Sequence, residues 1–147
     1  MNGIFIIAHA PLAQALKACA MHVFPDSASA ITALDVPPNL PPEETLASAR
    51  MALAQMATTQ NLVLTDVFGA TPCNVAQKLV DGVNSRLITG VNLPMLLRVL
   101  TYRNESLDAL VTRAVAGGTQ GVMQVAVTAP QHPVKKLHDQ NPYDHQQ

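Results

Sequence analysis

The amino-acid sequence predicts a three-layer, doubly wound α/β domain, in which a mostly parallel sheet carries helices on both faces. Short runs of consecutive apolar residues, such as residues 4–7, are typical of strands buried on both faces, as in a parallel sheet. Segments with apolar residues at helical spacing alternate with these runs, which is the pattern of βαβ units. The length of 147 residues and the hydrophobic fraction of 48% suffice for one domain with its own core.

Five segments are expected to form strands. The four central, parallel ones are residues 2–8, 30–36, 62–65 and 86–90. Pro37 and Pro38 end the second of them, because proline lacks the N–H group that strand pairing needs. Residues 122–127 alternate apolar and polar side chains, which indicates an edge strand rather than a central one.

Five segments with apolar residues at helical spacing are expected to form helices: residues 11–23, 41–56, 71–80, 93–101 and 106–116. Pro11 suits the first turn of the first helix, where a missing N–H costs nothing. Glu43 and Glu44 stabilise the start of the second helix through the helix dipole. Gly117 and Gly118 follow the last helix and are expected to end it.

Composition narrows the possible environments and partners. The chain has 9 Lys and Arg against 10 Asp and Glu and no basic block, which excludes a nucleic acid or an anionic membrane held by charge alone. The two cysteines, Cys19 and Cys73, are too few for a disulfide framework and favour a reducing cytosol. No apolar run approaches the roughly 18–20 residues that span a bilayer, so a cytosolic protein without membrane insertion is expected. Residues 1–127 are expected to be the domain and residues 128–147 a polar, mobile tail.

Polar side chains lie at the expected carboxyl ends of three strands, where open α/β sheets bind their ligands. His9 follows the first strand, Asp66 follows the third, and Asn92 lies shortly after the fourth. A carboxylate beside an imidazole can bond one ring nitrogen and leave the other as a nucleophile. The plainer alternatives are a half-buried His9 that bonds a backbone carbonyl and an Asp66 that only caps a loop or helix.

The turn from Gly69 to Pro72 adds a third candidate element. Small residues such as Ala70 let the backbone approach a ligand, and Thr71 is expected as the N-cap of the third helix, with Pro72 at the first helical position. Free N–H groups and the helix dipole at such a start favour an anion, above all a phosphate. Ordinary helix capping explains the same residues. Together, a nucleophilic imidazole, an orienting carboxylate and an anion site indicate phosphoryl transfer.

Other chemistry remains open at this point. Cys73 in the first turn of that helix could act as a nucleophile with His9 as its base, although packing of a small buried side chain is the simpler role. Cys19 and His22 lie one helical turn apart, but two ligands do not make a metal site. A receiver domain would also carry an aspartate after its third strand, but it needs an acidic pair where this chain has Ala8 and His9.

The constellation resembles the enzyme IIA domain of the mannose family of the bacterial sugar phosphotransferase system. The resemblance covers roughly residues 1–127 and rests on four motifs: IFIIAH at 4–9, LTDVFGATPCN at 64–74, GVNLPML at 90–96 and GTQGV at 118–122. It implies that His9 is phosphorylated on Nε2, that Asp66 bonds its Nδ1, and that Thr71 and the neighbouring backbone at Ala70 meet the phosphoryl oxygens. It implies no metal and no organic cofactor.

The resemblance also implies partners. The phosphocarrier protein HPr would donate the phosphoryl group and a IIB protein would accept it, and two copies of the chain would form a dimer that exchanges the C-terminal edge strand. The chain departs from the family in its histidine loop. The family's histidine is commonly preceded by a small hydroxylated residue or glycine and followed by glycine, whereas here Ala8 precedes it and Ala10 and Pro11 follow it. The polar tail of this sequence carries no linker and IIB domain, so the expectation is a separate IIB protein or no IIB partner at all.

Three alternative functions share these residues or this fold. A regulator would use the phosphorylation state of His9 to change its binding to another protein. The phosphotransferase subunit of a dihydroxyacetone kinase shares the fold and the histidine but fits residues 68–74 less well. A ligand-binding module without catalysis would not need His9 at all.

Overall fold

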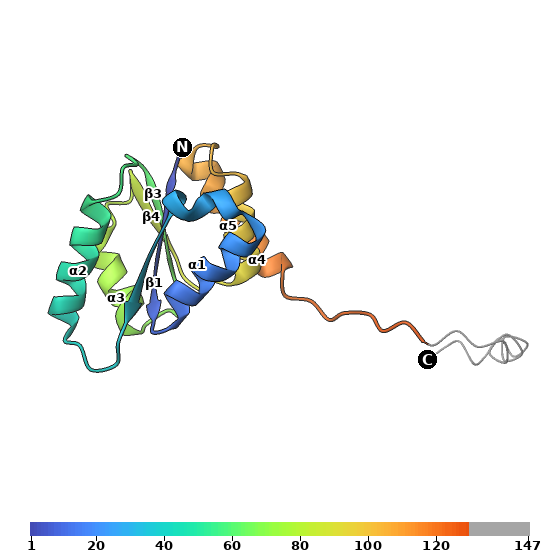
Figure 1. Ribbon diagram of the computed structural model, residues 1–147, viewed down its shortest axis with the longest axis horizontal. Helices are drawn as coiled ribbons and strands as arrows, with labels where there is room; N and C mark the ends of the chain where they lie inside the picture. Colours follow the sequence, from blue (N-terminus) through green and yellow to red (C-terminus); the bar gives the residue numbers. More distant parts are fainter. Residues whose placement is uncertain (130–147) are drawn as a thin grey trace, which may run out of the picture.

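In the computed structural model, which describes residues 1–129, an all-parallel sheet lies between two layers of helices (Figure 1). Its four strands stand in the order β2-β1-β3-β4. They are β1 (Gly3–His9), β2 (Ile31–Val36), β3 (Asn61–Thr65) and β4 (Ser85–Ile88). The prediction of a parallel three-layer α/β fold is therefore confirmed. The predicted tail lies outside the described residues from residue 130 onward.

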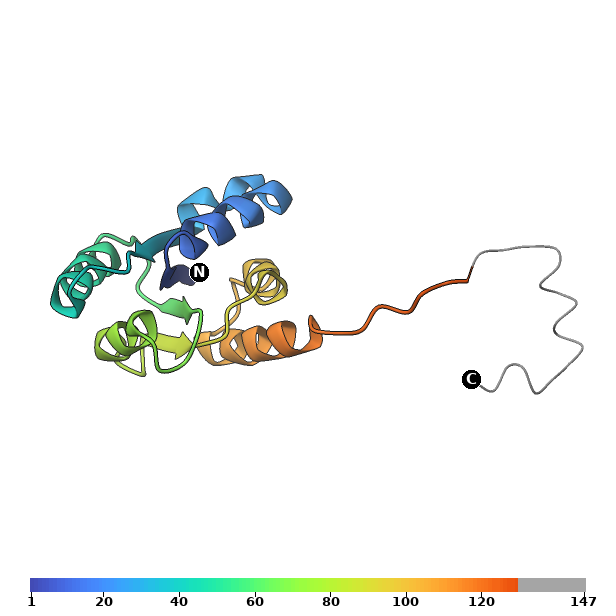
Figure 2. The same ribbon diagram turned by 90° about the horizontal axis from the view of Figure 1, so that it is seen from below.

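Five α-helices and one short 3₁₀ helix, η1, cover the sheet (Figures 1 and 2). They are α1 (Leu12–Val23), η1 (Pro25–Ala30), α2 (Pro42–Ala54), α3 (Thr71–Leu79), α4 (Leu93–Thr101) and α5 (Leu107–Gln120). Helices α2 and α3 lie on one face, and α1, α4 and α5 lie on the other. None of the helices within residues 1–129 is long and apolar enough to span a membrane.

Strand β1 shows why the sheet is buried on both faces. Ile4 and Ile6 are fully buried among residues of α1, α4 and α5. Phe5 and Ile7, which point the other way, are fully buried against α2 and α3. Burying each such side chain stabilises the fold by about 1.5–3 kcal/mol. His9 is the first exposed residue of β1 and, by the same alternation, falls on the α2–α3 face.

The strand order creates a switch point between β1 and β3. The chain leaves β1 through α1 to reach β2 on one side, and later returns through α2 to β3 on the other side. The connections that leave the carboxyl ends of β1 and β3 therefore diverge over opposite faces of the sheet. In open α/β sheets, ligands bind at this place.

Helix α5 continues through two glycines that were expected to end it. A Cβ atom on Gly117 would lie 2.7 Å from Cβ of Arg98, and one on Gly118 would lie 2.8 Å from Cε of Met95. The missing side chains thus let α5 pack directly against α4. The prediction of a helix end at this point is wrong because the glycines serve contact between two helices, and not chain reversal.

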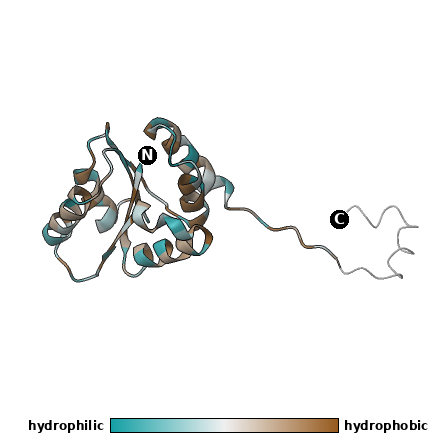
Figure 3. Ribbon diagram, turned by 45° about the horizontal axis from the view of Figure 1, so that its top comes forward, coloured by the Kyte–Doolittle hydropathy of each residue, from teal (hydrophilic) through white to brown (hydrophobic). Residues whose placement is uncertain are grey.

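Residues 122–127 form no strand in the structure, so the predicted fifth strand is absent from the sheet of the single chain. From residue 122 to residue 129 the chain leaves the domain in an extended course (Figures 1 and 2). Figure 3 shows hydrophobic residues along this segment. Val125 and Val127 are 75% and 93% exposed. Alternation alone predicted an extended segment but could not provide a neighbouring strand within the same chain.

Candidate active site

His9 and Asp66 meet at the carboxyl edge of the sheet. Strand β1 pairs with β3 so that Ile7 lies beside Thr65. His9 comes two residues after Ile7, and Asp66 directly follows Thr65, so both polar residues lie at the carboxyl end of the sheet. His9 Nδ1 and Asp66 Oδ2 are 2.6 Å apart, a short hydrogen bond between an imidazole and a carboxylate. Two residues 57 positions apart in the sequence are therefore joined directly.

The Asp66 carboxylate accepts two further hydrogen bonds. The backbone N–H of His9 donates to Oδ2 at 3.0 Å, and the backbone N–H of Val67 donates to Oδ1 at 2.9 Å. The backbone around Asp66 is also fixed, because Gly90 N–H donates to the Asp66 carbonyl and Val91 N–H donates to the Thr65 carbonyl. Asp66 does cap its own loop through Val67, but the same carboxylate also binds His9.

The electrostatics of Asp66 favour its charged form. Burial acts to raise the pKa of Asp66, but the hydrogen bonds from the His9 backbone, the His9 ring and the Val67 backbone outweigh it and hold the pKa below its usual value. The Asp66 side chain is 11% exposed, whereas the His9 side chain is 50% exposed. A carboxylate that stays ionised in this position fixes the imidazole by charge as well as by geometry.

The hydrogen bond to Asp66 assigns the two ring nitrogens of His9 to different roles. When Nδ1 carries the proton and donates it to Asp66, Nε2 keeps a lone pair. Among residues 1–129, Nε2 has no hydrogen-bond partner. The ring partner of His9 is thus a carboxylate and not a backbone carbonyl, and Nε2 of this half-exposed ring is available as a nucleophile.

Ala70 and Thr71 stand at the start of α3. The structure makes Ala70 the N-cap and Thr71 the first helical residue, so the expected N-cap position of Thr71 is one residue off. No side chain caps this helix, and Pro72 follows at its second residue. Helix α3 packs against β1, but no hydrogen bond within the described residues joins Thr71 or Ala70 to His9 or Asp66.

The other candidates from the sequence have different surroundings. Cys73 is buried, 1% exposed, and forms no hydrogen bond with His9 in the described part of the chain. Cys19 is exposed, and residues 1–129 contain no group of three side chains able to hold a metal ion. Asn92 caps α4 by accepting from Met95 N–H at 2.9 Å and donates to the Gly118 carbonyl at 3.1 Å. Asn92, the polar residue that follows the fourth strand, therefore has a structural role.

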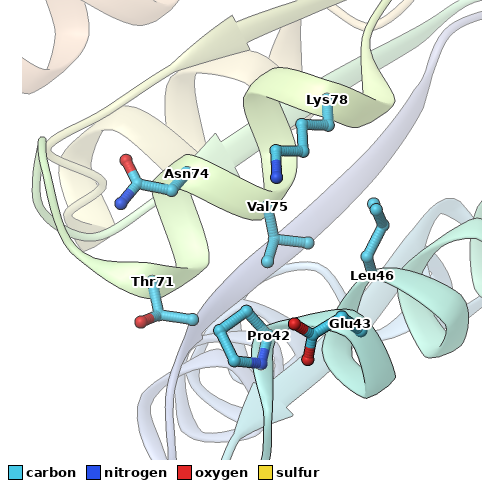
Figure 4. A pocket seen from close by; sticks show the side chains of 7 residues that line it. All are labelled: Pro42, Glu43, Leu46, Thr71, Asn74, Val75 and Lys78. Atoms are coloured by element: carbon cyan, nitrogen blue, oxygen red, sulfur yellow. The ribbon is translucent and has the colours of Figure 1, made fainter.

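A pocket between α2 and α3 was not expected from the sequence. It has a volume of about 310 Å³, and Thr71 lines it together with residues of both helices (Figure 4). Its lining residues are Pro42, Glu43, Leu46, Thr71, Asn74, Val75 and Lys78. The pocket depends on how two helices pair, and no local sequence pattern carries that information.

The fold and the site together define a class of protein, namely an α/β domain in which a carboxylate holds an imidazole at the switch point of the sheet. A family model described as "PTS system fructose IIA component", of the EIIA-man type, matches residues 3–115. The chain belongs to this family, which confirms the resemblance seen in the sequence.

The chain is also similar to curated proteins and to solved structures. The mannose-specific EIIAB component of Escherichia coli is 42% identical over 74 residues, a match that covers 48% of this chain and only 23% of that protein. The mannose/sorbose-specific IIA subunit from Enterococcus faecalis has a TM-score of 0.76 at 22% identity, with 88% of this chain and 98% of that chain covered. A sigma-54 interaction domain protein from Enterococcus faecalis reaches a TM-score of 0.68 at 17% identity, with 82% and 92% covered. These two structural likenesses establish the shared fold.

We expect Asp66→Asn to remove part of the acid dependence of stability. Because the pKa of Asp66 is lower in the folded chain than the unfolded value of about 3.9, the carboxylate stabilises the fold above that pH, and this contribution is lost as the pH falls through the folded pKa. Denaturant unfolding of both chains from about pH 6 to about pH 2 measures this. The difference in free energy of unfolding between the wild type and Asp66→Asn should become smaller as the pH falls.

Asp26→Asn is the control, because Asp26 lies in η1, away from the switch point. Its free energy of unfolding should follow that of the wild type through the acid range. A difference between wild type and Asp66→Asn that stays constant down to the lowest pH would contradict the assignment of an ionised, hydrogen-bonded Asp66.

Proposed function

We propose that the chain is a phosphohistidine carrier that accepts a phosphoryl group on Nε2 of His9. The observation that carries this proposal is the 2.6 Å contact between His9 Nδ1 and Asp66 Oδ2, beside a ring that is half exposed. Membership of the IIA component family supports it. The arrangement presents one imidazole nitrogen as a nucleophile at the surface, where another protein can reach it.

The proposed step needs only groups of this chain and of its partner. The lone pair of His9 Nε2 forms a bond to phosphorus while the bond from phosphorus to the donor's nitrogen breaks, and the electron pair stays with the donor. The His9 ring becomes positively charged, and its Nδ1 proton remains in the hydrogen bond to Asp66. The negative charge of Asp66 stabilises that cation, so the carboxylate favours the product as well as the correct tautomer.

The start of α3 is proposed to bind the phosphoryl oxygens. Within residues 1–129, the hydroxyl of Thr71 and the backbone N–H groups of Thr71 and Cys73 have no hydrogen-bond partner. Such groups at a helix start, together with the helix dipole, attract an anion. Ala70, with no large side chain, leaves the approach to these groups open.

The partners follow from the family. We propose that phospho-HPr is the donor, that a IIB protein or domain is the acceptor, and that the relay serves sugar uptake in the bacterial cytoplasm. The relative from Escherichia coli is described as a mannose-specific EIIAB component, which supports a IIB acceptor. In the regulatory alternative His9 keeps the phosphoryl group, and its phosphorylation state changes the binding of the chain to another protein. In the dihydroxyacetone kinase alternative another kinase subunit, and not a IIB protein, receives the group.

We expect the chain to gain one acid-labile phosphoryl group when incubated with phosphoenolpyruvate, enzyme I and HPr. His9→Ala should abolish the gain and leave the circular dichroism spectrum unchanged, because His9 is exposed. Intact mass spectrometry measures the gain. His22→Ala is the matched control, since His22 is an exposed histidine on α1.

Normal phosphorylation of His9→Ala would overturn the site. If the wild type is phosphorylated, adding purified IIB separates transport from regulation. Loss of the label to IIB supports transport, and retention of the label favours a regulatory role.

Thr71→Ala should slow phosphorylation by about fivefold, the effect of one neutral hydrogen bond worth ~1 kcal/mol. The loss should be smaller than that of Asp66→Asn, because backbone N–H groups still hold the anion. Rapid-quench measurement of transfer from phospho-HPr gives both rates. Thr71→Ser keeps the hydroxyl and should behave as the wild type, and an unchanged rate in Thr71→Ala would leave that residue a purely structural role.

We also propose a homodimer in which residues 122–127 of one copy pair with strand β4 of the other. Strand β4 ends the sheet, and a hollow of about 310 Å³ lies beside it. Its lining includes Ile88 of β4, Val115 of α5 and Val122 of the extended segment. The apolar side chains of the extended segment are unburied in the single chain, which is unfavourable in water. Pairing would cover both them and the open strand edge.

Light scattering after size exclusion should therefore give twice the mass of the chain. Val125→Asp should shift the protein to the monomer, because a charge would be buried in the paired strand. Val23→Asp is the control, an exposed valine at the end of α1, the helix that packs against β2 at the far side of the sheet from β4. A monomeric wild type at micromolar concentration would exclude the dimer.

A further inference from the structure

Phosphoryl exchange at His9, if the proposed function holds, needs a partner protein in contact with the surface around this residue. A standard interface buries about 800 Å² on each partner, equivalent to a disc of about 16 Å radius. The surface next to His9 and Asp66 must therefore lie within the contact. The identity of the side chains in that area decides what the partner offers.

Apolar side chains are exposed beside both residues of the pair. Val67 is 51% exposed and Phe68 is 73% exposed, and they directly follow Asp66. Leu12, three residues after His9, is 37% exposed. Phe5, in contrast, is fully buried in the core. An exposed aromatic ring two residues after the carboxylate that binds His9 is typical of an anchor residue at an interface.

The loop that carries Phe68 is held in place before any partner arrives. Asp66 accepts the Val67 N–H, and its own carbonyl accepts from Gly90. On the other side Gly69 adopts φ +90°, a conformation that favours glycine, and its carbonyl accepts from Asn74 Nδ2 at 3.4 Å. A preorganised anchor loses little conformational entropy on binding.

The pocket between α2 and α3, called the α2–α3 groove from here on, includes Thr71, which lies three residues after Phe68. Figure 4 shows the apolar side chains of Pro42, Leu46 and Val75, which line the groove. Glu43 and Lys78 come from opposite helices, and no ion pair joins them in the described part of the chain. Thr71, at the start of α3, belongs both to the groove and to the proposed phosphoryl site.

We propose that Phe68 and the α2–α3 groove form the docking surface for the phosphocarrier protein that exchanges the group with His9. The partner covers the Phe68 ring with an apolar hollow and inserts an apolar side chain into the groove, with a carboxylate facing Lys78. Thr71 belongs to both the groove and the proposed phosphoryl site. Glu43 and Lys78, which form no ion pair within residues 1–129, favour a partner that places charges of opposite sign against them.

The test compares a protein donor with a small one. Phosphoramidate phosphorylates the imidazole without docking, because Nε2 bonds to phosphorus while the P–N bond breaks and ammonia leaves with the electron pair. Phe68→Ala should lower kcat/KM for transfer from phospho-HPr by about tenfold, as a hot-spot residue does. Lys78→Glu should lower it as well, and more strongly at low salt. Phosphorylation by phosphoramidate should stay at the wild-type rate in both variants.

Matched controls lie away from this surface. Val83→Ala removes an exposed apolar side chain before β4, at the amino end of the sheet, and Lys17→Glu makes the same charge change on α1, on the other face of the sheet. Both should transfer at the wild-type rate.

Four results have defined meanings. Loss with phospho-HPr alone supports the docking surface. Unchanged transfer in Phe68→Ala and Lys78→Glu overturns it, and so does equal loss with both donors, since the residues would then act on the chemical site. A wild type that accepts a phosphoryl group from neither donor removes the carrier role itself, and the docking surface with it.

Discussion

The structure depends on the carboxylate of Asp66 at the end of β3. This one group accepts hydrogen bonds from the backbone of His9, from the ring of His9 and from the backbone of Val67. It therefore fixes where β1 ends, how the imidazole is turned and how the following loop begins. Three donors that a flexible loop would leave to water are organised around a side chain that is 11% exposed. Its negative charge is what makes this organisation favourable, because charged hydrogen bonds are roughly twice as strong as neutral ones.

The fold gives the carboxylate this position. Buried apolar side chains on both faces of β1 and β3 fix the register of the two strands, so that Ile7 and Thr65 are neighbours and the next residues reach the edge together. The core thus determines the position of His9 and Asp66 by fixing the register of β1 and β3. A slip of β3 by one residue would move Asp66 to the other face of the sheet and away from the imidazole.

Much of the fold and the central pair could be predicted from the sequence, because their signals are local. Apolar runs define buried strands, and a polar residue at the end of such a run must lie at the sheet edge, as His9 and Asp66 do. Contacts between elements could not be predicted in this way. Gly117 and Gly118 have the composition of a helix end, yet they serve the packing of α5 on α4. Residues 122–127 have the alternation of a strand, but a strand also needs a neighbour, which the single chain does not provide. The groove beside Thr71 likewise arises only when α2 meets α3.

Pro72 at the second residue of α3 has a consequence for how firmly a charge is held. A proline there removes one of the backbone N–H groups that a helix start normally presents. The proposed anion site therefore has one donor fewer than the start of an ordinary helix. Tight binding of a phosphorylated state would lower its energy and raise the barrier to giving the group away. The proposed carrier would have to release the phosphoryl group as readily as it accepts it, and a helix start with one donor fewer would keep those two states closer in free energy.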